Sequence, residues 1–245
     1  MSGITLAIDS ATSRLTVAVA RGGASFDRHV DGPRRHANEI LTLVDELLAE
    51  ANATVQDIEH VITGDGPGSF TGLRVAASVA KAITWGRDDV RWLTTPSLLV
   101  RAMSVARATD ARPITVLALS DALRGELYVG CWRFEADRVQ RVGPSPRAIK
   151  PDALAEFGTV QAAIGSIPEQ LVDTVRASVG VEPITGDAAL PDARNLVALA
   201  GLEGGVESIR DRAGWQPEYG RPAEAQAVWE RKFGRPLPDS SYHSG

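Results

Sequence analysis

A glycine-rich segment, Gly64–Arg74, contains the residue types that point most directly to chemistry. It reads Gly-Asp-Gly-Pro-Gly-Ser-Phe-Thr-Gly-Leu-Arg and lies between a short apolar stretch and a helical run. Glycine permits positive φ and close backbone approach, and Ser69 or Thr71 can cap the free amides of the helix. Such a loop presents N–H groups and the positive end of a helix, which suit an anion. Its spacing matches neither the phosphate-binding loop Gly-x-x-x-x-Gly-Lys-Ser/Thr nor the dinucleotide fingerprint.

Residues that ligate metals or act as nucleophiles form no recognisable constellation. The chain has four histidines, and no two of them stand four residues apart, the spacing that places two ligands on one helix face. His36 and Glu39 can meet on one helical turn, an arrangement more typical of a surface or capping contact. Cys131 lies within an apolar stretch, which favours a buried, inert thiol. The sequence therefore predicts neither a catalytic residue nor a metal site.

Composition predicts a cytoplasmic globular protein. Of the 245 residues, 44% are hydrophobic and 23% are charged, which is ordinary for a chain with a buried core. The apolar stretches are far shorter than the ~20 residues of a membrane-spanning helix, and the N-terminus has the pattern of a strand rather than a signal peptide. A single cysteine fits a reducing compartment. With a net charge of −5 and no basic stripe, we expect any nucleic acid to be held through a partner.

The order of predicted elements repeats once along the chain. Each half begins with an apolar strand that ends at a polar turn, Ile4–Ile8 before Asp9 and Ile114–Leu119 before Asp121. Hydrophobic periodicity supplies the remaining elements. In the first half these are strands 15–20, 25–30, 60–63 and 90–94 with helices 34–51, 75–85 and 96–108. In the second half they are strands 126–134, 139–142, 160–164 and 181–184 with helices 152–157, 169–178 and 193–201.

This duplicated βββαβα order predicts an α/β protein with two lobes, each built on a mixed sheet with crossover helices. We expect an N-terminal lobe over residues 1–110, which includes the glycine-rich segment, and a C-terminal lobe over residues 111–213. Residues 214–245 are rich in proline and glycine and are expected to form a tail with one short helix near Glu224–Lys232.

Residues 66–74, Gly-Pro-Gly-Ser-Phe-Thr-Gly-Leu-Arg, resemble the signature of the TsaB family, the bacterial tRNA threonylcarbamoyladenosine biosynthesis proteins. The resemblance spans nearly the full length, because four further segments are similar to family motifs: Ile8–Thr12, His36–Leu41, Asp121–Tyr128 and Pro217–Arg221. The chain departs from the family pattern at Leu123, where arginine is usual, and at Gly220, where leucine is usual. The resemblance implies the fold of the actin, sugar-kinase and heat-shock-chaperone superfamily.

The resemblance also implies a function, that of a non-catalytic scaffold. The family works in the complex that transfers threonylcarbamoyl to adenosine 37 of ANN-decoding tRNAs. A member would activate the catalytic subunit TsaD, act together with the ATPase TsaE and meet tRNA only through the complex. When alone it would form a homodimer. No cofactor is expected.

Two alternatives remain open. In ATP-using members of the superfamily, carboxylates at strand ends face the metal–phosphate, so Asp9, Thr12 and Asp121 are candidates for a nucleotide site in an ATPase or kinase that acts on its own. However, the turn after Asp9 lacks the glycine that lets backbone approach a phosphate. These residues can instead cap their turns through Asx-type hydrogen bonds. The other alternative is a stand-alone homodimer with an unrelated binding role.

Two helices of the first half carry the expected interface. Helix 34–51 has more apolar residues than one face requires, and the helix after the glycine-rich segment is rich in small residues, which allow close helix–helix approach. Such helices are either buried between layers or part of an interface, and in the family they pair with TsaD or a second copy. The interface and motif residues are His36, Ile40, Leu43, Val44, Leu47, Gly66, Pro67, Gly68, Ser69, Phe70, Thr71, Gly72, Leu73, Arg74, Ala76, Ala77 and Ala80. We expect Asp or Arg at Leu47 or Ala77 to break the pairing and leave the fold largely intact.

Overall fold

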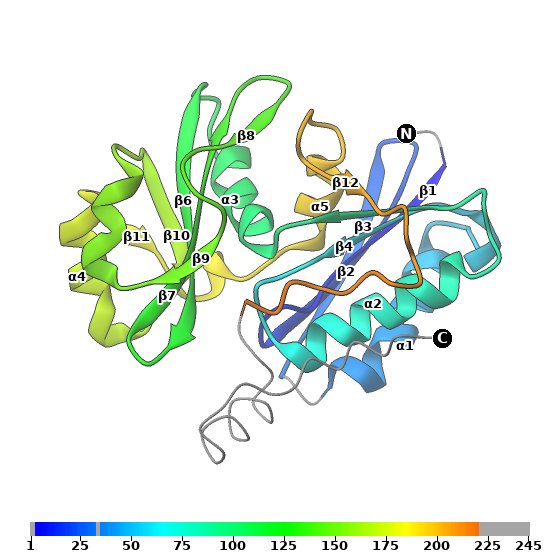
Figure 1. Ribbon diagram of the computed structural model, residues 1–245. Coiled ribbons are helices and arrows are strands. Elements are labelled where there is room, and N and C mark those ends of the chain that lie inside the picture. The colour runs from blue at the N-terminus through cyan, green and yellow to red at the C-terminus, as the bar shows by residue number, and fades with distance from the viewer. Residues whose placement is uncertain (1–2, 33–34, 221–245) are drawn as a thin grey trace, which may run out of the picture.

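The computed structural model describes residues 3–32 and 35–220, and the expected tail helix Glu224–Lys232 lies outside them. Within these residues the chain forms two α/β lobes, each with its own sheet (Figure 1). The predicted fold class is therefore confirmed. No helix in this part of the chain is long and apolar enough to cross a membrane.

The first sheet is mixed, because short turns join its first three strands as antiparallel hairpins whereas crossover helices make its central strands parallel. In spatial order it contains β12 (Glu207–Ser208), β5 (Arg91–Thr95), β4 (Ile58–Gly64), β1 (Ile4–Asp9), β2 (Arg14–Arg21) and β3 (Ala24–Asp31). Strand β1 is buried on both faces, which explains its continuous apolar run. Asp9 is the last residue of β1. It therefore lies at the carboxyl ends of the parallel strands, where the functional residues of α/β proteins are usually found.

The second sheet repeats this arrangement. In spatial order it contains β11 (Pro183–Ile184), β10 (Ala162–Ser166), β6 (Ile114–Leu123), β7 (Glu126–Phe134) and β8 (Val139–Arg141), with β9 (Arg147–Ile149) also paired to β7. Strand β6 is parallel to β10 and antiparallel to β7, as β1 is parallel to β4 and antiparallel to β2. The repeat predicted from the order of elements is therefore present in the sheets.

The helices form three layers around the two sheets (Figure 1). α1 (His36–Glu50) and α2 (Phe70–Thr84) cover the outer face of the first sheet, with the short helix η1 (Val55–Asp57) nearby. α3 (Ser97–Arg107) and α5 (Ala193–Leu199) lie between the sheets, which explains why α3 is buried on most sides. η2 (Pro151–Phe157) and α4 (Glu169–Val179) cover the outer face of the second sheet, and η3 (Gly186–Ala189) precedes α5.

The structure differs from the sequence-based expectation near the end of the second half. α5 was expected in the C-terminal lobe, but it packs against β1 and β2, and β12 pairs with β5. The chain therefore returns to the first lobe before residue 213. The cause is apolar burial, because Ala193, Leu196 and Leu199 are fully buried in the layer between the sheets. The predicted helix 152–157 is also a 3-10 helix, and the strand expected at 181–184 has two residues.

Residues 209–220, the C-terminal strap, run beside α2 and appear in orange in Figure 1. Arg212 donates to three backbone carbonyl oxygens at and after the end of α2, those of Thr84, Arg87 and Val90. The Trp215 ring lies 4.7 Å from that of Trp92, and the Tyr219 ring lies 4.4 Å from that of Phe70. The strap thus holds α2 at both of its ends.

Candidate functional site

The glycine-rich segment joins β4 to α2 and packs against the turn that follows β1. A Cβ atom on Gly68 would lie 2.3 Å from the carbonyl oxygen of Ala11, and one on Gly72 would lie 2.0 Å from that of Ser10. The Ser10 hydroxyl also donates to the carbonyl oxygen of Gly72 at 2.7 Å. Glycine is required at both positions because a side chain would force α2 away from the first sheet.

Several backbone amides of this segment have protein acceptors. The N–H of Gly66 donates to the Ser97 Oγ at 3.2 Å, and the N–H of Ser69 donates to the carbonyl oxygen of Ala11 at 2.7 Å. The Ser69 Oγ accepts from the N–H of Gly72 at 3.2 Å and so caps α2. Amides bound in this way are not available to an anion. The segment therefore sets the position of α2.

Asp9 is completely buried behind the turn after β1. One carboxylate oxygen, Oδ1, accepts the N–H of Ala11 at 2.9 Å, and Oδ2 has no hydrogen bond among the described residues. Burial raises the pKa of Asp9, whereas the Ala11 amide and the charge of Arg101 act to lower it. Arg101 is itself buried, with a pKa lowered by burial to about 10, so it stays a cation at neutral pH. The fold therefore supplies its own positive charge near Asp9.

A small polar cleft of about 230 Å³ lies between the lobes, lined in part by Thr12, Arg101 and Asp121. Arg101 enters it from α3 and donates through Nη1 to the carbonyl oxygen of Leu119 and to the Ser166 Oγ, both at 3.0 Å. The Thr12 Oγ1 accepts the N–H of Arg14 at 3.0 Å, and the Asp121 Oδ1 accepts the N–H of Leu123 at 2.7 Å. Thr12 and Asp121 thus face one cleft while capping their own turns. The cleft is smaller than the roughly 300–1,000 Å³ of typical ligand pockets.

The single side chains that could bind a metal or act as a nucleophile make contacts that stabilise the fold. The His36 Nε2 lies 3.1 Å from the carbonyl oxygen of Ser13, which ties the start of α1 to the β1–β2 turn. Glu39 pairs with Arg35 at 3.0 Å rather than with His36. Burial raises the pKa of the Cys131 thiol to about 11, which makes it unreactive at neutral pH. Among the described residues, no group of three or more His, Cys, Asp or Glu side chains is placed to hold a metal ion.

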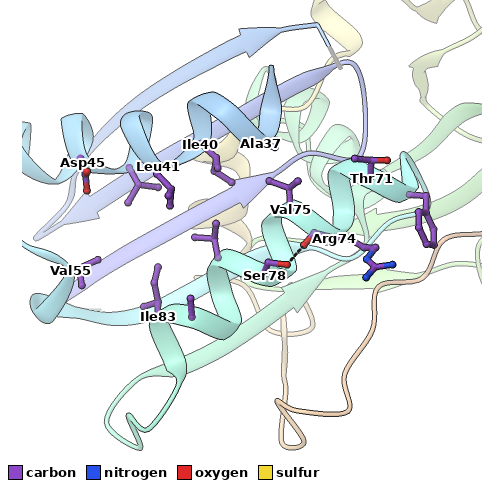
Figure 2. Close-up of a pocket in the computed structure, with 14 residues that line it drawn as sticks. Ala37, Ile40, Leu41, Asp45, Val55, Thr71, Arg74, Val75, Ser78 and Ile83 are labelled. Carbon is purple, nitrogen blue, oxygen red and sulfur yellow. Dashed lines mark hydrogen bonds between the residues drawn. The ribbon is translucent and has the colours of Figure 1, made fainter. Parts of the chain in front are cut away.

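An apolar groove of about 640 Å³ lies between α1 and α2 on the outer side of the first lobe (Figure 2). We call the groove and its rim the α1/α2 surface. Its most exposed apolar side chains are Leu41, 61% exposed on α1, Phe70, 37% exposed on α2, and Val55, 36% exposed. The rest of its lining is Ala37, Ile40, Val44, Asp45, Thr71, Arg74, Val75, Ser78, Val79, Ala82 and Ile83.

Five of the predicted interface residues line this surface, namely Ile40, Val44, Phe70, Thr71 and Arg74. Two others, Gly68 and Ser69, line the cleft between the lobes instead. The remaining ten are buried in the single chain: His36, Leu43, Leu47, Gly66, Pro67, Gly72, Leu73, Ala76, Ala77 and Ala80.

The expectation for Leu47 and Ala77 is therefore corrected. Leu47 is fully buried and Ala77 is 7% exposed, because both pack in the core beneath α1 and α2. A charge at either position would enter that core and destabilise the fold. Small residues on α2 serve close packing on the first sheet rather than an exposed face.

The interface prediction included Phe70 but omitted Leu41, Val55 and the half-buried Val75. Leu41 and Val75 belong to α1 and α2 but face away from the sheet, and Val55 comes from the 3-10 helix between α1 and β4. The sequence does indicate Leu41, because this leucine lies outside the apolar stripe that α1 buries in the core. Nothing in the sequence pattern indicates that Val55 lines this surface.

The C-terminal strap closes over the glycine-rich segment. The N–H of Glu218 donates to the carbonyl oxygen of Asp65 at 2.8 Å. Gly220 has a φ of +72°, and a Cβ there would lie 2.7 Å from Pro67 and from the Tyr128 ring, so glycine replaces the usual leucine for a steric reason. The pKa of Asp65 is raised to about 7, mainly by burial and further by nearby carboxylates such as Glu218, while the Thr94 hydroxyl opposes the rise.

Comparison with known proteins gives a consistent result. The family model described as TsaD, tRNA N6-adenosine threonylcarbamoyltransferase, matches residues 31–177, more than half of the chain. The chain is 26% identical over 232 residues to the tRNA threonylcarbamoyladenosine biosynthesis protein TsaB of Bacillus subtilis, and the alignment covers 91% of this chain and 96% of that protein.

Two further proteins match over most of the chain. The chain is 33% identical over 172 residues to an uncharacterized protein of Mycobacterium tuberculosis, across 66% of this chain and 76% of that protein. Among solved structures, an uncharacterized protein of Pseudomonas aeruginosa with similarity to peptidase YeaZ matches with a TM-score of 0.72 and 26% identity. This match covers 90% of the present chain and 100% of that one.

Proposed function

The chain belongs to the TsaD family, in its TsaB branch, and on this basis we propose that it is a non-catalytic scaffold subunit in tRNA threonylcarbamoyladenosine biosynthesis. The complex transfers threonylcarbamoyl to adenosine 37 of ANN-decoding tRNAs, and TsaD performs the transfer. This chain pairs with TsaD through the α1/α2 surface and stabilises its active form. The ATPase TsaE and the tRNA join the complex, and a second copy of the chain takes the place of TsaD when TsaD is absent.

The α1/α2 surface is the observation that carries the binding role. Exposed apolar side chains on a monomer are usually scattered, and a contiguous apolar patch marks an interaction site. Here Leu41, Val55 and Phe70 line one groove between α1 and α2, where Figure 2 shows the side chains of Leu41 and Val55. A groove lined by helix side chains suits the apolar face of a partner helix. The positions of α1 and α2 are fixed from beneath by the first sheet and, for α2, by the glycine-rich segment and the strap.

The interior of the interlobe cleft supports the non-catalytic part of the proposal. A catalytic carboxylate must reach a substrate or a metal ion, whereas Asp9 is sealed behind its own turn. The guanidinium of Arg101 occupies the interior next to Asp9 with a charge that a catalytic cation would otherwise supply. Thr12 Oγ1 and Asp121 Oδ1 each accept a local N–H group and so cap their own turns. These features favour a scaffold over an enzyme.

Reconstituted tRNA modification tests the function. TsaD, TsaE, tRNA and threonylcarbamoyl-AMP are combined with and without this chain, and formation of the modified adenosine is measured. We expect modification to depend on the chain and to persist when Asp9→Asn or Asp121→Asn replaces the wild type. Wild-type modification without the chain would overturn the proposal. A nucleotide titration of the chain alone tests the alternative, since an independent ATPase or kinase would bind ATP and lose it on Asp9→Ala.

A further inference from the structure

Arg74 is an exposed cation on the rim of an otherwise apolar groove. Its guanidinium carbon lies 5.3 Å from the centroid of the Phe70 ring, a cation–π arrangement that orients the side chain. Among the described residues no carboxylate lies within ion-pair distance of Arg74. Several other arginines of the first lobe have such partners, for example Arg28 with Glu50 at 2.8 Å. Within the described part of the chain, Arg74 therefore presents an oriented positive charge without an ion-pair partner beside the groove.

Asp45 is the counterpart of Arg74 on the other helix. It is exposed on α1 and, like Arg74, has no ion pair among the described residues. These two are the charged residues in the lining of the groove, and the other members are apolar or small polar side chains. Figure 2 shows Arg74 and Thr71 toward one end of the groove and Asp45 and Val55 toward the other. The groove thus has a positive end and a negative end.

Docking of a partner would remove both charges from water. Burial of an unpaired charge is strongly unfavourable, so a partner that covers Arg74 must supply an acceptor, and the planar guanidinium fits a carboxylate best. A partner that covers Asp45 must supply a cation in the same way. A partner docked in the reverse direction would bring like charges together at both ends, which costs several kcal/mol.

We propose that Arg74 and Asp45 determine which surface of TsaD binds and in which direction. The matching surface carries an apolar helix face, a carboxylate opposite Arg74 and a basic side chain opposite Asp45. This inference rests on the proposed function, because it takes TsaD as the occupant of the α1/α2 surface. Apolar contacts supply the affinity, while the two charges supply the direction and reject helix faces of the wrong polarity.

The test measures the affinity of the full-length chain for its cognate TsaD at several salt concentrations. We expect Arg74→Glu to weaken binding about 30-fold or more, because it places like charges together. Arg74→Met keeps much of the apolar stem, so it should weaken binding less and also reduce the salt dependence. Asp45→Lys should act as Arg74→Glu does. Circular dichroism checks that these variants fold, which we expect because both side chains are exposed and lie outside the core.

A matched variant separates failure of this inference from failure of the proposed function. Val75→Asp places a charge in the middle of the groove and should abolish binding if TsaD occupies the surface. Loss of binding with Val75→Asp, together with wild-type affinity and salt dependence for Arg74→Glu and Asp45→Lys, would overturn the inference alone. Wild-type binding by Val75→Asp would overturn both. The double variant Arg74→Glu/Asp45→Arg exchanges the two charges. If the single variants lost self-association and the double variant regained it without regaining TsaD binding, the two charges would pair with a second copy of the chain. The inference would then be wrong.

Discussion

The ring of Tyr219 lies 4.4 Å from the ring of Phe70, so the C-terminal strap touches the rim of the α1/α2 surface. Phe70 is the first residue of α2 and lines the groove, and the guanidinium of Arg74 lies over its ring. One side chain therefore connects the strap, the start of α2 and the charge of Arg74. Its position depends on contacts made far apart in the sequence.

Removing the Tyr219 ring should weaken this connection. Tyr219→Ala is expected to lower the free energy of unfolding by about 1 kcal/mol, the usual contribution of an aromatic pair, and to reduce affinity for TsaD. Tyr219→Phe keeps the ring and serves as the control. Chemical denaturation and binding titrations measure the two effects. Equal affinity for the alanine and phenylalanine variants would show that the strap does not support the surface.

Gly72 should not tolerate alanine although it lies inside a helix. Alanine normally stabilises a helix relative to glycine by about 1 kcal/mol. Here the added Cβ would lie 2.0 Å from the carbonyl oxygen of Ser10, so we expect a loss of about 2–3 kcal/mol. Gly201→Ala is the control, because its Cβ would come no closer than 3.3 Å to a neighbouring atom. Thermal unfolding distinguishes the two, and a stabilised Gly72→Ala variant would contradict the packing described here.

Two leucines of α1 should respond in opposite ways to aspartate. Leu47→Asp puts a carboxylate in the core and should lower stability by about 3 kcal/mol or more, whereas Leu41→Asp should leave the fold stable and weaken pairing. Circular dichroism melts and size-exclusion chromatography measure these outcomes. A stable, monodisperse Leu47→Asp chain would mean that α1 packs differently.

Asp65 should contribute a loss of stability as the pH rises from about 4 to 7. Its pKa is about 7 in the folded chain against an ordinary value of 3.8, so the folded state holds this proton more tightly than the unfolded state. The contribution is fully present below pH 4 and is lost through pH 7. The difference corresponds to at most about 4 kcal/mol.

Asp65→Asn removes this titration and should flatten the dependence of unfolding free energy on pH over that range. Some slope should remain, because the pKa of Asp9 is raised by burial as well. Exposed Asp110→Asn is the control. Denaturant melts at pH 5 and pH 8 provide the measurement, and an unchanged slope in Asp65→Asn would show that the strap leaves Asp65 accessible to water.

The fold was largely predictable because local signals agree with it. The apolar strands that end at Asp9 and at Asp121 predicted the repeat, and both strands lie at the centre of their sheets. The return of α5 to the first lobe was not predictable. Its apolar residues Leu196 and Leu199 mark a buried helix, but periodicity does not say which sheet buries it.

The site was harder to predict than the fold. Phe70 and Arg74 were identified through a motif, and they line the groove. Leu41 was visible as an extra apolar residue, but only the packing of α1 on the sheet shows that it faces outward while Leu47 faces inward. The spacing of apolar residues predicts which side of a helix is buried. It does not predict that the exposed sides of two helices lie next to each other and form a groove.

The most direct test of the central claim is light scattering coupled to size-exclusion chromatography on this chain mixed with its cognate TsaD. The account predicts a one-to-one complex with the wild type, no complex with Val75→Asp, and an unchanged complex with Leu123→Asp, a control that places the same charge at an exposed leucine on the other lobe. A one-to-one complex that forms equally well with Val75→Asp would contradict the assignment of the α1/α2 surface. Failure of the wild type to bind TsaD would contradict the scaffold role.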